Sequence, residues 1–415
     1  MAFQLHRQAH QSLVRRFARS RCAADDGIVA DGYHHTVQIR ELRLPLGLLL
    51  GKRPSTLGVF RTPQGDAIAM VPRIWTDEAK VLRTVRSHLP DVPRCLATVG
   101  TSTLVGYVPG RVLANEVPEG GFYGTVQMTK VADFFVALAG VPKDDIPGLP
   151  ADWPSDGDCQ GFLERLARFS IEVVYRPNLD RFGALFDGVG APQNAVERFL
   201  PGVVKLTKRP FSLLHTDVHR GNVVVSPRKN GERLIPIDWE SALYGDPLHE
   251  LATHLVRMRY VDVERDAMIG HWARAMGPRH PGAIVGLEED LPTYMAFERV
   301  QSVYPDVMRA ALRLLKQEPT EERFAKAAGE ACRAVRVARQ ALGLGESPVG
   351  LPEAEAALRH WRDEERRAAL ACGHGEGASE ADGTRTHGHR GPGAVSGLLG
   401  GVITTALTLG PVIQW

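Results

Sequence analysis

The chain of 415 residues contains little cysteine and no excess of charge of either sign. Its five cysteines are scattered without a Cys-x-x-Cys pair, so neither a zinc site of the usual spacing nor a disulfide framework is expected. Fifty Lys and Arg residues against 48 Asp and Glu leave a formal net charge of +2, which excludes the basic footprint of a nucleic-acid-binding protein. The first residues lack the apolar run of a secretory signal peptide. We therefore expect a cytoplasmic protein with no nucleic-acid partner.

Apolar residues are numerous enough for a buried core. Hydrophobic residues make up 44% of the chain and charged residues 24%, values near the globular average, so a wholly disordered chain is excluded. The length predicts two or three units. We expect an N-terminal lobe over 1–113, a helical C-terminal lobe over 114–370 and a disordered tail over 371–415.

The expected tail is rich in glycine and ends in an uncharged stretch. Ten glycines fall between 373 and 401, a composition typical of disordered segments. Residues 391–415 carry no charge and are long enough for a membrane span. Glycine and threonine dilute their apolar content, however, and Pro411 interrupts it. We therefore expect no membrane partner, and this stretch is the one candidate for an anchor.

Short apolar or β-branched runs bounded by turn residues predict strands in the first zone. They lie at 28–30, 37–39, 57–60, 67–71 and 103–108. A helix is predicted from Glu78 onward, because apolar residues at 81, 82 and 85 form one stripe after Thr76 or Asp77 as N-cap.

Apolar residues at three-and-four spacing predict helices over most of the second zone. These helices lie around 126–140, 158–173, 294–316, 320–343 and 353–371. One hairpin interrupts them, with strands at 223–225 and 234–237. A small β-rich unit before a larger helical unit with an embedded hairpin predicts an α+β fold with two lobes.

The strongest chemical signal is the pattern His-x-Asp-x-x-x-x-Asn at His215, Asp217 and Asn222, with Asp238 sixteen residues after the asparagine. Phosphoryl transfer needs a carboxylate to orient the acceptor hydroxyl and take its proton, a role open to Asp217. Magnesium needs hard oxygen ligands, which Asn222 and Asp238 could supply. Taken singly, an Asp and an Asn in a loop are ordinary turn residues. Because the predicted hairpin returns Asp238 to the loop, we favour the catalytic interpretation.

These segments resemble the aminoglycoside phosphotransferase and choline-kinase-like small-molecule kinases, a family with a protein-kinase-like fold. The resemblance lies in HTDVHRGN at 215–222, IDWE at 237–240 and GDPLHELA at 245–252. It implies that His215 and Asp217 belong to the catalytic loop with Asp217 as base, that Asn222 and Asp238 bind magnesium, and that ATP is the donor. A protein kinase is the poorer match, because Asp238 is followed by Trp-Glu instead of Phe-Gly and no Ala-Pro-Glu segment is found.

The same resemblance implies a nucleotide site in the first zone. Gly32 lies in a loop between two predicted strands, where the family covers the phosphates, although Gly-x-Gly-x-x-Gly is absent and a plain turn is the simpler interpretation. Val105 and Tyr107 lie in a segment that resembles the family's interlobe linker, where backbone groups meet the adenine; locally it is an ordinary strand and turn. Glu78 stands where the family has a helix glutamate that pairs with a strand lysine, although a glutamate in a first turn also complements the helix dipole.

The expected strand lysine is missing. The predicted strand over 67–73 has Met70 near that place, and Arg73 is the nearest cation, with Arg61 on the preceding strand and Lys52 in an earlier loop. An arginine binds phosphate through a planar fork and does not simply replace a lysine point charge. We expect either an arginine in this role or weakened nucleotide binding.

We predict an ATP- and magnesium-dependent phosphotransferase that moves the γ-phosphoryl group to a hydroxyl of a small molecule. The alternative is a kinase-fold module that holds a nucleotide or metabolite with weak or no turnover, which the missing lysine motivates. A polycationic aminoglycoside would need nearby carboxylates, and Glu240, Glu250 and residues 288–290 are acids in the appropriate lobe. Choline-like amines, sugars, macrolides and other hydroxylated metabolites stay open.

Overall fold

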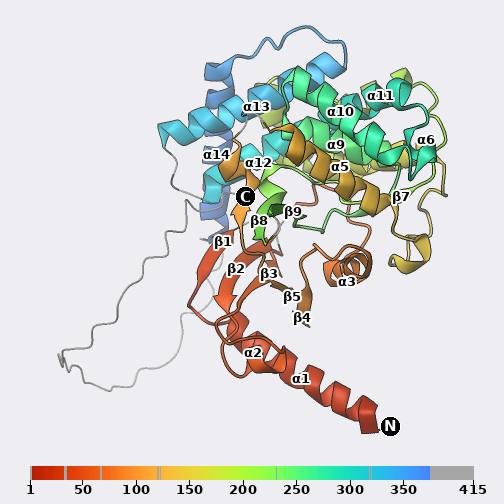
Figure 1. Cartoon of the computed structure of the whole chain (residues 1–415). Coiled ribbons are helices and arrows are strands. Elements are labelled where there is room, and N and C mark those ends of the chain that lie inside the picture. Colours follow the sequence, from red (N-terminus) through yellow and green to blue (C-terminus); the bar gives the residue numbers. More distant parts are fainter. Residues whose placement is uncertain are drawn as a thin grey trace, which may run out of the picture.

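The computed structural model describes residues 2–31, 35–65, 68–118, 121, 123–229, 231–316, 318 and 320–373. Within them, a five-stranded sheet lies beside a larger group of helices that carries a β-hairpin (Figure 1). The expected α+β fold with two lobes is confirmed. Gly32 and nearly all of the expected tail, including 391–415, lie outside the described residues, and the exact lobe boundaries stay predictions.

The N-terminal lobe is built on one antiparallel sheet with the strand order β1-β2-β3-β5-β4. Its strands are β1 (Ile28–Asp31), β2 (His35–Glu41), β3 (Leu57–Pro63), β4 (Cys95–Val99) and β5 (Ser102–Gly106). Helix α3 (Glu78–His88) follows β3, as expected, and the side chain of Asp77 accepts a hydrogen bond from the N–H of Ala79 at 3.0 Å. This cap satisfies one of the amides that a helix start leaves unpaired.

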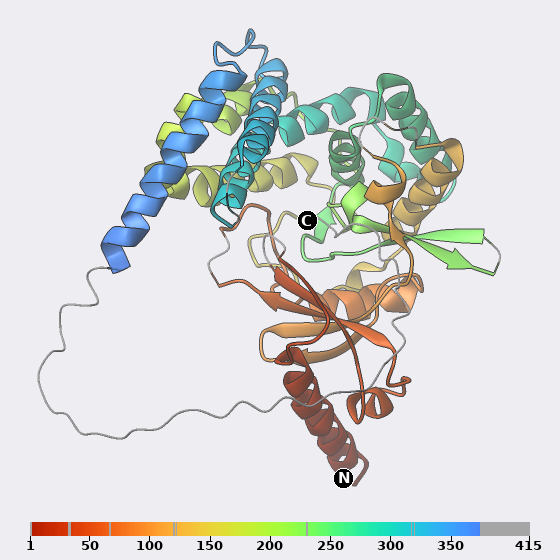
Figure 2. The same ribbon diagram turned by 90° about the vertical axis from the view of Figure 1, so that its left-hand side faces the viewer.

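Helix α1 (Ala2–Cys22) packs beside β4 and extends away from the sheet (Figures 1 and 2). Val14 and Ala18 of this helix are buried with Leu42, Phe60 and Leu104 in a small hydrophobic core. This core is separate from the main one, so the attachment of α1 does not depend on the helical lobe.

The C-terminal lobe packs its helices around one large core. The longer helices are α5 (Thr125–Ala139), α6 (Cys159–Phe169), α7 (Leu179–Gly188), α9 (Pro247–Met258), α10 (Asp262–Met276), α11 (Leu287–Gln301), α12 (Val303–Lys316), α13 (Glu321–Ala341) and α14 (Leu351–Gly373). Two short helices, α4 (Leu113–Glu116) and α8 (Ala195–Phe199), follow the sheet in sequence, whereas the short α2 (Leu46–Leu49) packs against α1 in the N-terminal lobe. Helix α5 packs against α10, and α11 packs against α9. No helix in the described part of the chain is both long and apolar enough to cross a membrane.

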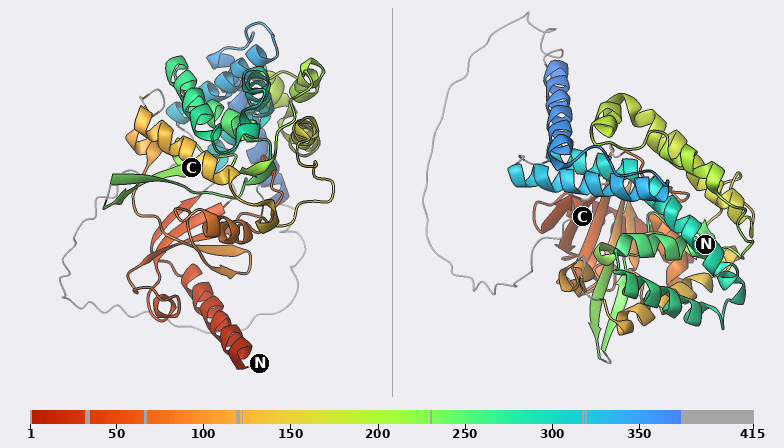
Figure 3. Two further views of the ribbon diagram at one scale, coloured as in Figure 1. Left: turned by 45° about the vertical axis from the view of Figure 1, so that its right-hand side comes forward. Right: turned by 90° about the horizontal axis from the view of Figure 1, so that it is seen from above.

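Two small sheets position the loops that carry the predicted catalytic residues. β8 (Val223–Arg228) and β9 (Gly231–Pro236) form the expected hairpin, and β6 (Arg111–Val112) adds to β8. The hairpin lies beside α5, on the side of the helical lobe that faces the five-stranded sheet (Figure 3). β7 (Ser212–Leu214) pairs with β10 (Leu243–Gly245), which brings the segments after β7 and before β10 together.

Two sequence-based predictions are wrong. Residues 68–70 form no strand, because the chain leaves the sheet after β3 and reaches α3 as a loop in which Pro72 lacks a sheet donor. Met70 and Trp75 of this loop are buried in the core of the helical lobe. The helix expected over 294–316 is two helices, α11 and α12, that meet at Ser302; Pro305 suits the first turn of the second helix.

A buried ion-pair network ties three parts of the helical lobe together. The guanidinium of Arg209 donates to Asp246 (2.7 Å) and Asp290 (2.6 Å), and the hydroxyl of Tyr294 donates to Asp246 (2.9 Å). Arg209 and Asp246 are fully buried. Asp246 also caps α9 by accepting from the N–H of Leu248, so the network fixes the start of the helix that supports the catalytic loop.

We expect Arg209→Met to destabilise the protein by about 3–5 kcal/mol, because it keeps the volume but leaves two buried carboxylates without their cation. Arg176→Met is the matched control, since Arg176 is an exposed partner of Glu197 and should cost less than about 1 kcal/mol. Urea unfolding followed by circular dichroism measures both. Equal midpoints for the two variants would contradict a structural role for the network.

Candidate active site

The loop after β7 has a backbone conformation that costs free energy. Thr216 has a φ of +60°, a value that a β-branched residue rarely adopts. The N–H groups of His215 and Thr216 donate to the carboxylate of Glu250 at 2.5 and 2.8 Å, and the Thr216 hydroxyl donates to the carbonyl of Ser241 at 2.7 Å. These bonds hold the loop in its strained form against α9.

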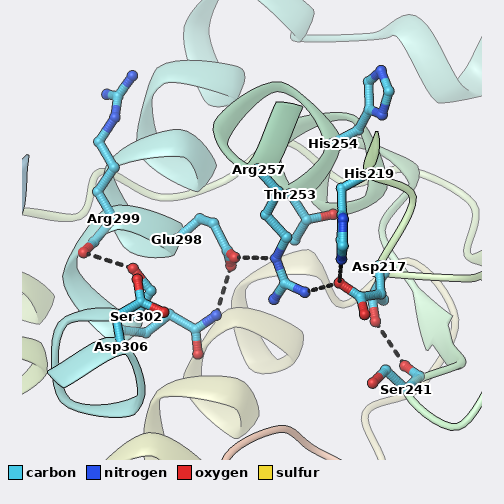
Figure 4. Close-up of polar contacts among 12 residues, drawn as sticks. Asp217, His219, Ser241, Thr253, His254, Arg257, Glu298, Arg299, Ser302 and Asp306 are labelled. Atoms are coloured by element: carbon cyan, nitrogen blue, oxygen red, sulfur yellow. Dashed lines mark hydrogen bonds and ion pairs between the residues drawn. The ribbon is translucent and has the colours of Figure 1, made fainter. Parts of the chain in front are cut away.

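Asp217 lies at the end of this strained segment, with both carboxylate oxygens in contact. Its Oδ2 accepts from the Asn222 side-chain amide at 2.7 Å. Its Oδ1 accepts from the Arg257 guanidinium and lies 3.4 Å from His219 Nε2 (Figure 4). Burial acts to raise the pKa of Asp217, but His219 and Arg257 outweigh it and hold the pKa well below its usual range. Asp217 is therefore ionised at neutral pH.

Asp238 is held beside the catalytic loop by its backbone and faces the sheet. The N–H of Ile237 donates to the carbonyl of Asn222 at 2.9 Å, and Asp238 itself has a φ of +66°. Its carboxylate accepts from Arg61 of β3. Burial raises the pKa of Asp238 to about 6, with Arg61 opposing the shift and the neighbouring Glu240 and Glu78 adding to it.

Arg61 is the cation that meets the α3 glutamate. Its guanidinium donates to Glu78 at 2.6 Å and to Asp238 at 2.5 Å, and only 11% of its side chain is exposed. Glu78 also accepts from the N–H of Trp239 at 3.1 Å. Arg73, Arg61 and Lys52 were the cations considered for this place. Residues 68–73 form no strand, so β3 is the last strand before α3, and its Arg61 is the cation that meets Glu78.

Glu240 also joins the two lobes where Arg61 meets Glu78 and Asp238, a place that we call the junction. It lies 2.7 Å from His35 of β2, 2.7 Å from Arg73 and 3.6 Å from Arg61. Burial acts to raise the pKa of Glu240, but His35 and then Arg61 and Arg73 lower it to about 2. The predicted site residue Arg73 thus lies at the junction, although its partner is a carboxylate of the helical lobe and not α3.

His215 is fully buried and packs against Trp239 beneath the catalytic loop. Its ring meets the ring of Trp239 edge-on, with centroids 4.6 Å apart, and its Nδ1 accepts from the N–H of Asp217 at 3.3 Å. Burial lowers the pKa of His215 to about 4, so the ring is neutral at pH 7. This geometry favours a role in positioning Asp217.

The predicted linker residues Val105 and Tyr107 lie on and just after β5, next to β3 in the sheet. Val105 pairs with Val59 of β3, and the N–H of Tyr107 donates to the carbonyl of Leu57 at 3.4 Å. Both lie on the stretch that leads from the sheet to the helical lobe. The predicted site residue Gly32 lies outside the described residues.

The residues predicted for magnesium offer oxygen atoms of the type that this ion prefers. The Asn222 amide donates its N–H group to Asp217, which leaves its carbonyl oxygen as an acceptor. The three carboxylates of Asp238, Glu240 and Glu78 surround Arg61, so this junction favours cations. Among the described residues, no group of three or more His, Cys, Asp or Glu side chains could hold a metal ion by itself.

Two residues at the site were missed in the sequence. Arg257 lies seven residues after Glu250, two helical turns along α9, so a search of that helix face could have found it. Glu298 of α11 accepts from Arg257 Nε at 2.9 Å and is almost fully buried. No pattern around Glu298 distinguishes it in the sequence.

The sequence profile of the phosphotransferase enzyme family matches residues 59–287. A search of curated proteins finds no significant match. Among solved structures, a putative aminoglycoside phosphotransferase from Ralstonia eutropha is 15% identical, covers 79% of this chain and 96% of its own, and has a TM-score of 0.47. A choline/ethanolamine kinase family protein from Mesorhizobium loti is 15% identical, with 81% and 94% covered and a TM-score of 0.42. A macrolide 2′-phosphotransferase from Brachybacterium faecium is 16% identical, with 77% and 98% covered and a TM-score of 0.43.

We expect Glu250 to make the free energy of unfolding fall as pH rises. Burial raises its pKa to about 7, although the N–H groups of Thr216 and His215 oppose the shift. Between about pH 4.5 and 7 the folded state binds a proton that the unfolded state has lost, so stability falls across this window by at most about 1.4 kcal/mol per pH unit.

Glu250→Gln cannot titrate, and every other group is shared, so the difference between the two proteins isolates this residue. Urea unfolding at pH 5, 6 and 7.5 should show the wild type losing stability relative to Glu250→Gln as pH rises. Parallel curves for the two proteins would show that Glu250 has no raised pKa.

Proposed function

The chain belongs to the phosphotransferase enzyme family, and on this premise we propose that it transfers the γ-phosphoryl group of ATP to a hydroxyl of a small molecule, with magnesium as cofactor. The observation that carries the proposal is the convergence of Asp217, Asn222 and Asp238 on one side of the Arg61–Glu78 pair. Strained backbone at Thr216 and Asp238, held by surrounding hydrogen bonds, is typical of functional sites.

Asp217 is proposed as the group that orients the acceptor hydroxyl and takes its proton. As the acceptor oxygen bonds to the γ-phosphorus, its proton passes to a carboxylate oxygen of Asp217 and the bond from phosphorus to the ADP oxygen breaks. The low pKa of Asp217 makes it a weak base, which suits a loose transition state in which the proton moves late and positioning supplies most of the rate.

Asn222 and Asp238 are proposed to hold magnesium through one amide oxygen and one carboxylate. When bound, this ion would neutralise charge on the transferring phosphates. The Asn222 side chain would then act at two points, because its N–H group fixes Asp217 while its oxygen faces the ion. The carboxylate of Asp238 already forms an ion pair with Arg61.

The sheet of the N-terminal lobe is proposed to receive the nucleotide, with residues 1–113 as the donor lobe and 114–370 as the lobe for the acceptor. Arg61 would contact the phosphates, placed by Glu78, and Arg73 would support it from the adjacent loop. Backbone groups at Val105 and Tyr107 would meet the adenine, and the loop with Gly32 would cover the phosphates. The cytoplasm, where ATP is present, is the compartment that we propose.

A binding module without turnover is the second candidate. It is favoured by one observation, that Arg61 is already neutralised by Glu78 and Asp238 and so has less charge to offer a phosphate. The presence of Asp217, Asn222 and Asp238 together argues against it, because a protein that only held a nucleotide would need neither an acceptor base nor a second oxygen ligand.

We expect Asp217→Asn to lower kcat by about a hundredfold or more, because the acceptor proton loses its carboxylate. ATP consumption in the presence of magnesium, scanned over aminoglycosides, macrolides, amino alcohols and sugars, measures this and identifies an acceptor class. Asp152→Asn is the matched control, since Asp152 is exposed and its ion pair is with Arg165 at 3.4 Å. Full turnover by Asp217→Asn would refute the assignment of the base, and nucleotide binding without turnover on any acceptor would favour the binding module.

We expect Arg61→Met to weaken ATP binding by about tenfold or more, because removing one partner of a buried charge group leaves the others uncompensated. Arg61→Lys should retain most of the affinity, since a lysine still presents one positive charge. Isothermal titration with a non-hydrolysable ATP analogue and magnesium measures both, with Arg83→Met, an exposed arginine of α3, as control. Equal affinity of Arg61→Met and wild type would exclude Arg61 from the phosphate site.

A further inference from the structure

One face of α9 supports the catalytic loop from end to end. Glu250, His254 and Arg257 are spaced at i, i+4 and i+7, so they lie on one side of the helix. Glu250 accepts from two backbone N–H groups at the start of the loop, and Nδ1 of His254 donates to the carbonyl of Val218 at 2.8 Å. Arg257 differs from the other two, because it contacts a side chain of the loop, the carboxylate of Asp217 (Figure 4).

Arg257 is anchored at its other end by a buried carboxylate. Its Nε donates to Glu298 of α11 at 2.9 Å, and Glu298 accepts a second bond from the Gln301 side chain at 2.6 Å. The oxygen of the Gln301 side chain lies 3.2 Å from the hydroxyl of Ser170, which is buried at the end of α6. Glu298 is 1% exposed. A row of polar contacts thus connects the interior of the helical lobe to Asp217.

The two carboxylate oxygens of Asp217 have different surroundings. Oδ1 accepts from Arg257 and lies 3.4 Å from Nε2 of His219. Nδ1 of His219 accepts from the N–H of Gly221 at 3.0 Å, so in the neutral ring the hydrogen is on Nε2, which faces Oδ1. Oδ2 accepts from Asn222 at 2.7 Å and keeps a second lone pair. Among the described side chains, two donors face Oδ1 and one faces Oδ2, so Oδ2 is the oxygen better placed to accept from a substrate hydroxyl.

The cost of burying Glu298 favours a role other than stability. A buried ion pair loses much of its Coulombic gain to desolvation, and apolar side chains of similar volume often stabilise a protein as well. Orientation is what an apolar pair could not supply, because the planar guanidinium of Arg257 joins two carboxylates at once. With Asn222 on one oxygen and Arg257 on the other, the Asp217 carboxylate cannot rotate about its Cβ–Cγ bond without losing both contacts.

We propose that Arg257 and Glu298 are positioning residues, which hold the carboxylate of Asp217 so that Oδ2 faces the acceptor hydroxyl. The acceptor proton passes to Oδ2 as the acceptor oxygen bonds to the γ-phosphorus and the bond from phosphorus to the ADP oxygen breaks. Arg257 keeps both of its carboxylate partners throughout. The inference rests on the proposed phosphotransferase function and adds two residues to its site.

Replacing the whole ion pair separates positioning from stability. Arg257→Met with Glu298→Leu puts apolar side chains in both places, so we expect a urea midpoint close to that of the wild type. We expect kcat to fall about tenfold or more and the KM for ATP to change by less than about twofold, because a misplaced reacting group slows the chemical step. Arg176→Met with Glu197→Leu removes a surface pair of the same lobe and should match the wild type.

Turnover is measured with ATP, magnesium and whichever of kanamycin, erythromycin, choline or glucose the wild type phosphorylates. A double-mutant cycle then tests whether the pair acts through Asp217. Asp217→Asn alone should lower kcat about a hundredfold. Adding Arg257→Met and Glu298→Leu to it should lower kcat by less than about twofold more, because the carboxylate that they position is already gone.

Arg257→Lys tests the same inference without removing the charge. An ammonium group cannot join two carboxylates through one rigid plane, so we expect kcat between that of the wild type and that of Arg257→Met with Glu298→Leu, again with little change in the KM for ATP. Melting temperatures show whether each variant folds. Where the double variant does not fold, the kcat of Arg257→Lys decides.

The outcomes distinguish the inference from the function on which it rests. Wild-type kcat in the folded double variant or in Arg257→Lys would overturn the inference and leave the function standing. A further tenfold loss on top of Asp217→Asn would also overturn it, since the pair would then act elsewhere than through Asp217. Absence of turnover by the wild type on every acceptor would remove the proposed function, and the inference with it.

Discussion

The contacts between the two lobes depend on the guanidinium of Arg61. It comes from the sheet and meets Glu78 of α3 and Asp238 of the helical lobe within 2.6 Å. Burying either carboxylate without a cation would destabilise the protein. The desolvation cost of one unpaired ion is larger than the stabilisation that most surface ion pairs provide. One cation between two acids therefore fixes the strand, the helix and the predicted magnesium ligand relative to one another.

A second constraint comes from Glu250 of α9, which supports the catalytic loop from inside the helical lobe. Its carboxylate binds the N–H groups of His215 and Thr216, which compensates the strain of Thr216 at positive φ. The start of the helix that carries Glu250 is capped by Asp246, itself bound by Arg209. This buried network thus reaches Asp217 through one helix, since α9 also carries Arg257.

Residues near one another in sequence were easier to predict than those joined by the fold. The helix from Glu78, the hairpin after Asn222 and the α+β order follow from local spacing and turn chemistry, which act over a few residues. The cation paired with Glu78 was left open among Arg73, Arg61 and Lys52, because an apolar run at 67–71 resembles a strand, although its residue Met70 is buried against the helical core. Likewise, Glu298 contacts Arg257 across 41 residues, and no local pattern records such a distance.

Arginine–carboxylate pairs occur at both ends of the candidate site. At the donor end, Asp238 and Glu240 are matched by Arg61, Arg73 and His35; at the acceptor end, Asp217 is matched by Arg257. In each case an arginine neutralises a carboxylate that the proposed reaction needs for another partner, the metal ion at one end and the acceptor hydroxyl at the other. Arg257 also pairs with the buried Glu298, and each oxygen of Asp217 has a second lone pair. An acceptor hydroxyl can therefore bind Asp217 in the proposed reaction while Arg257 keeps both of its carboxylate partners.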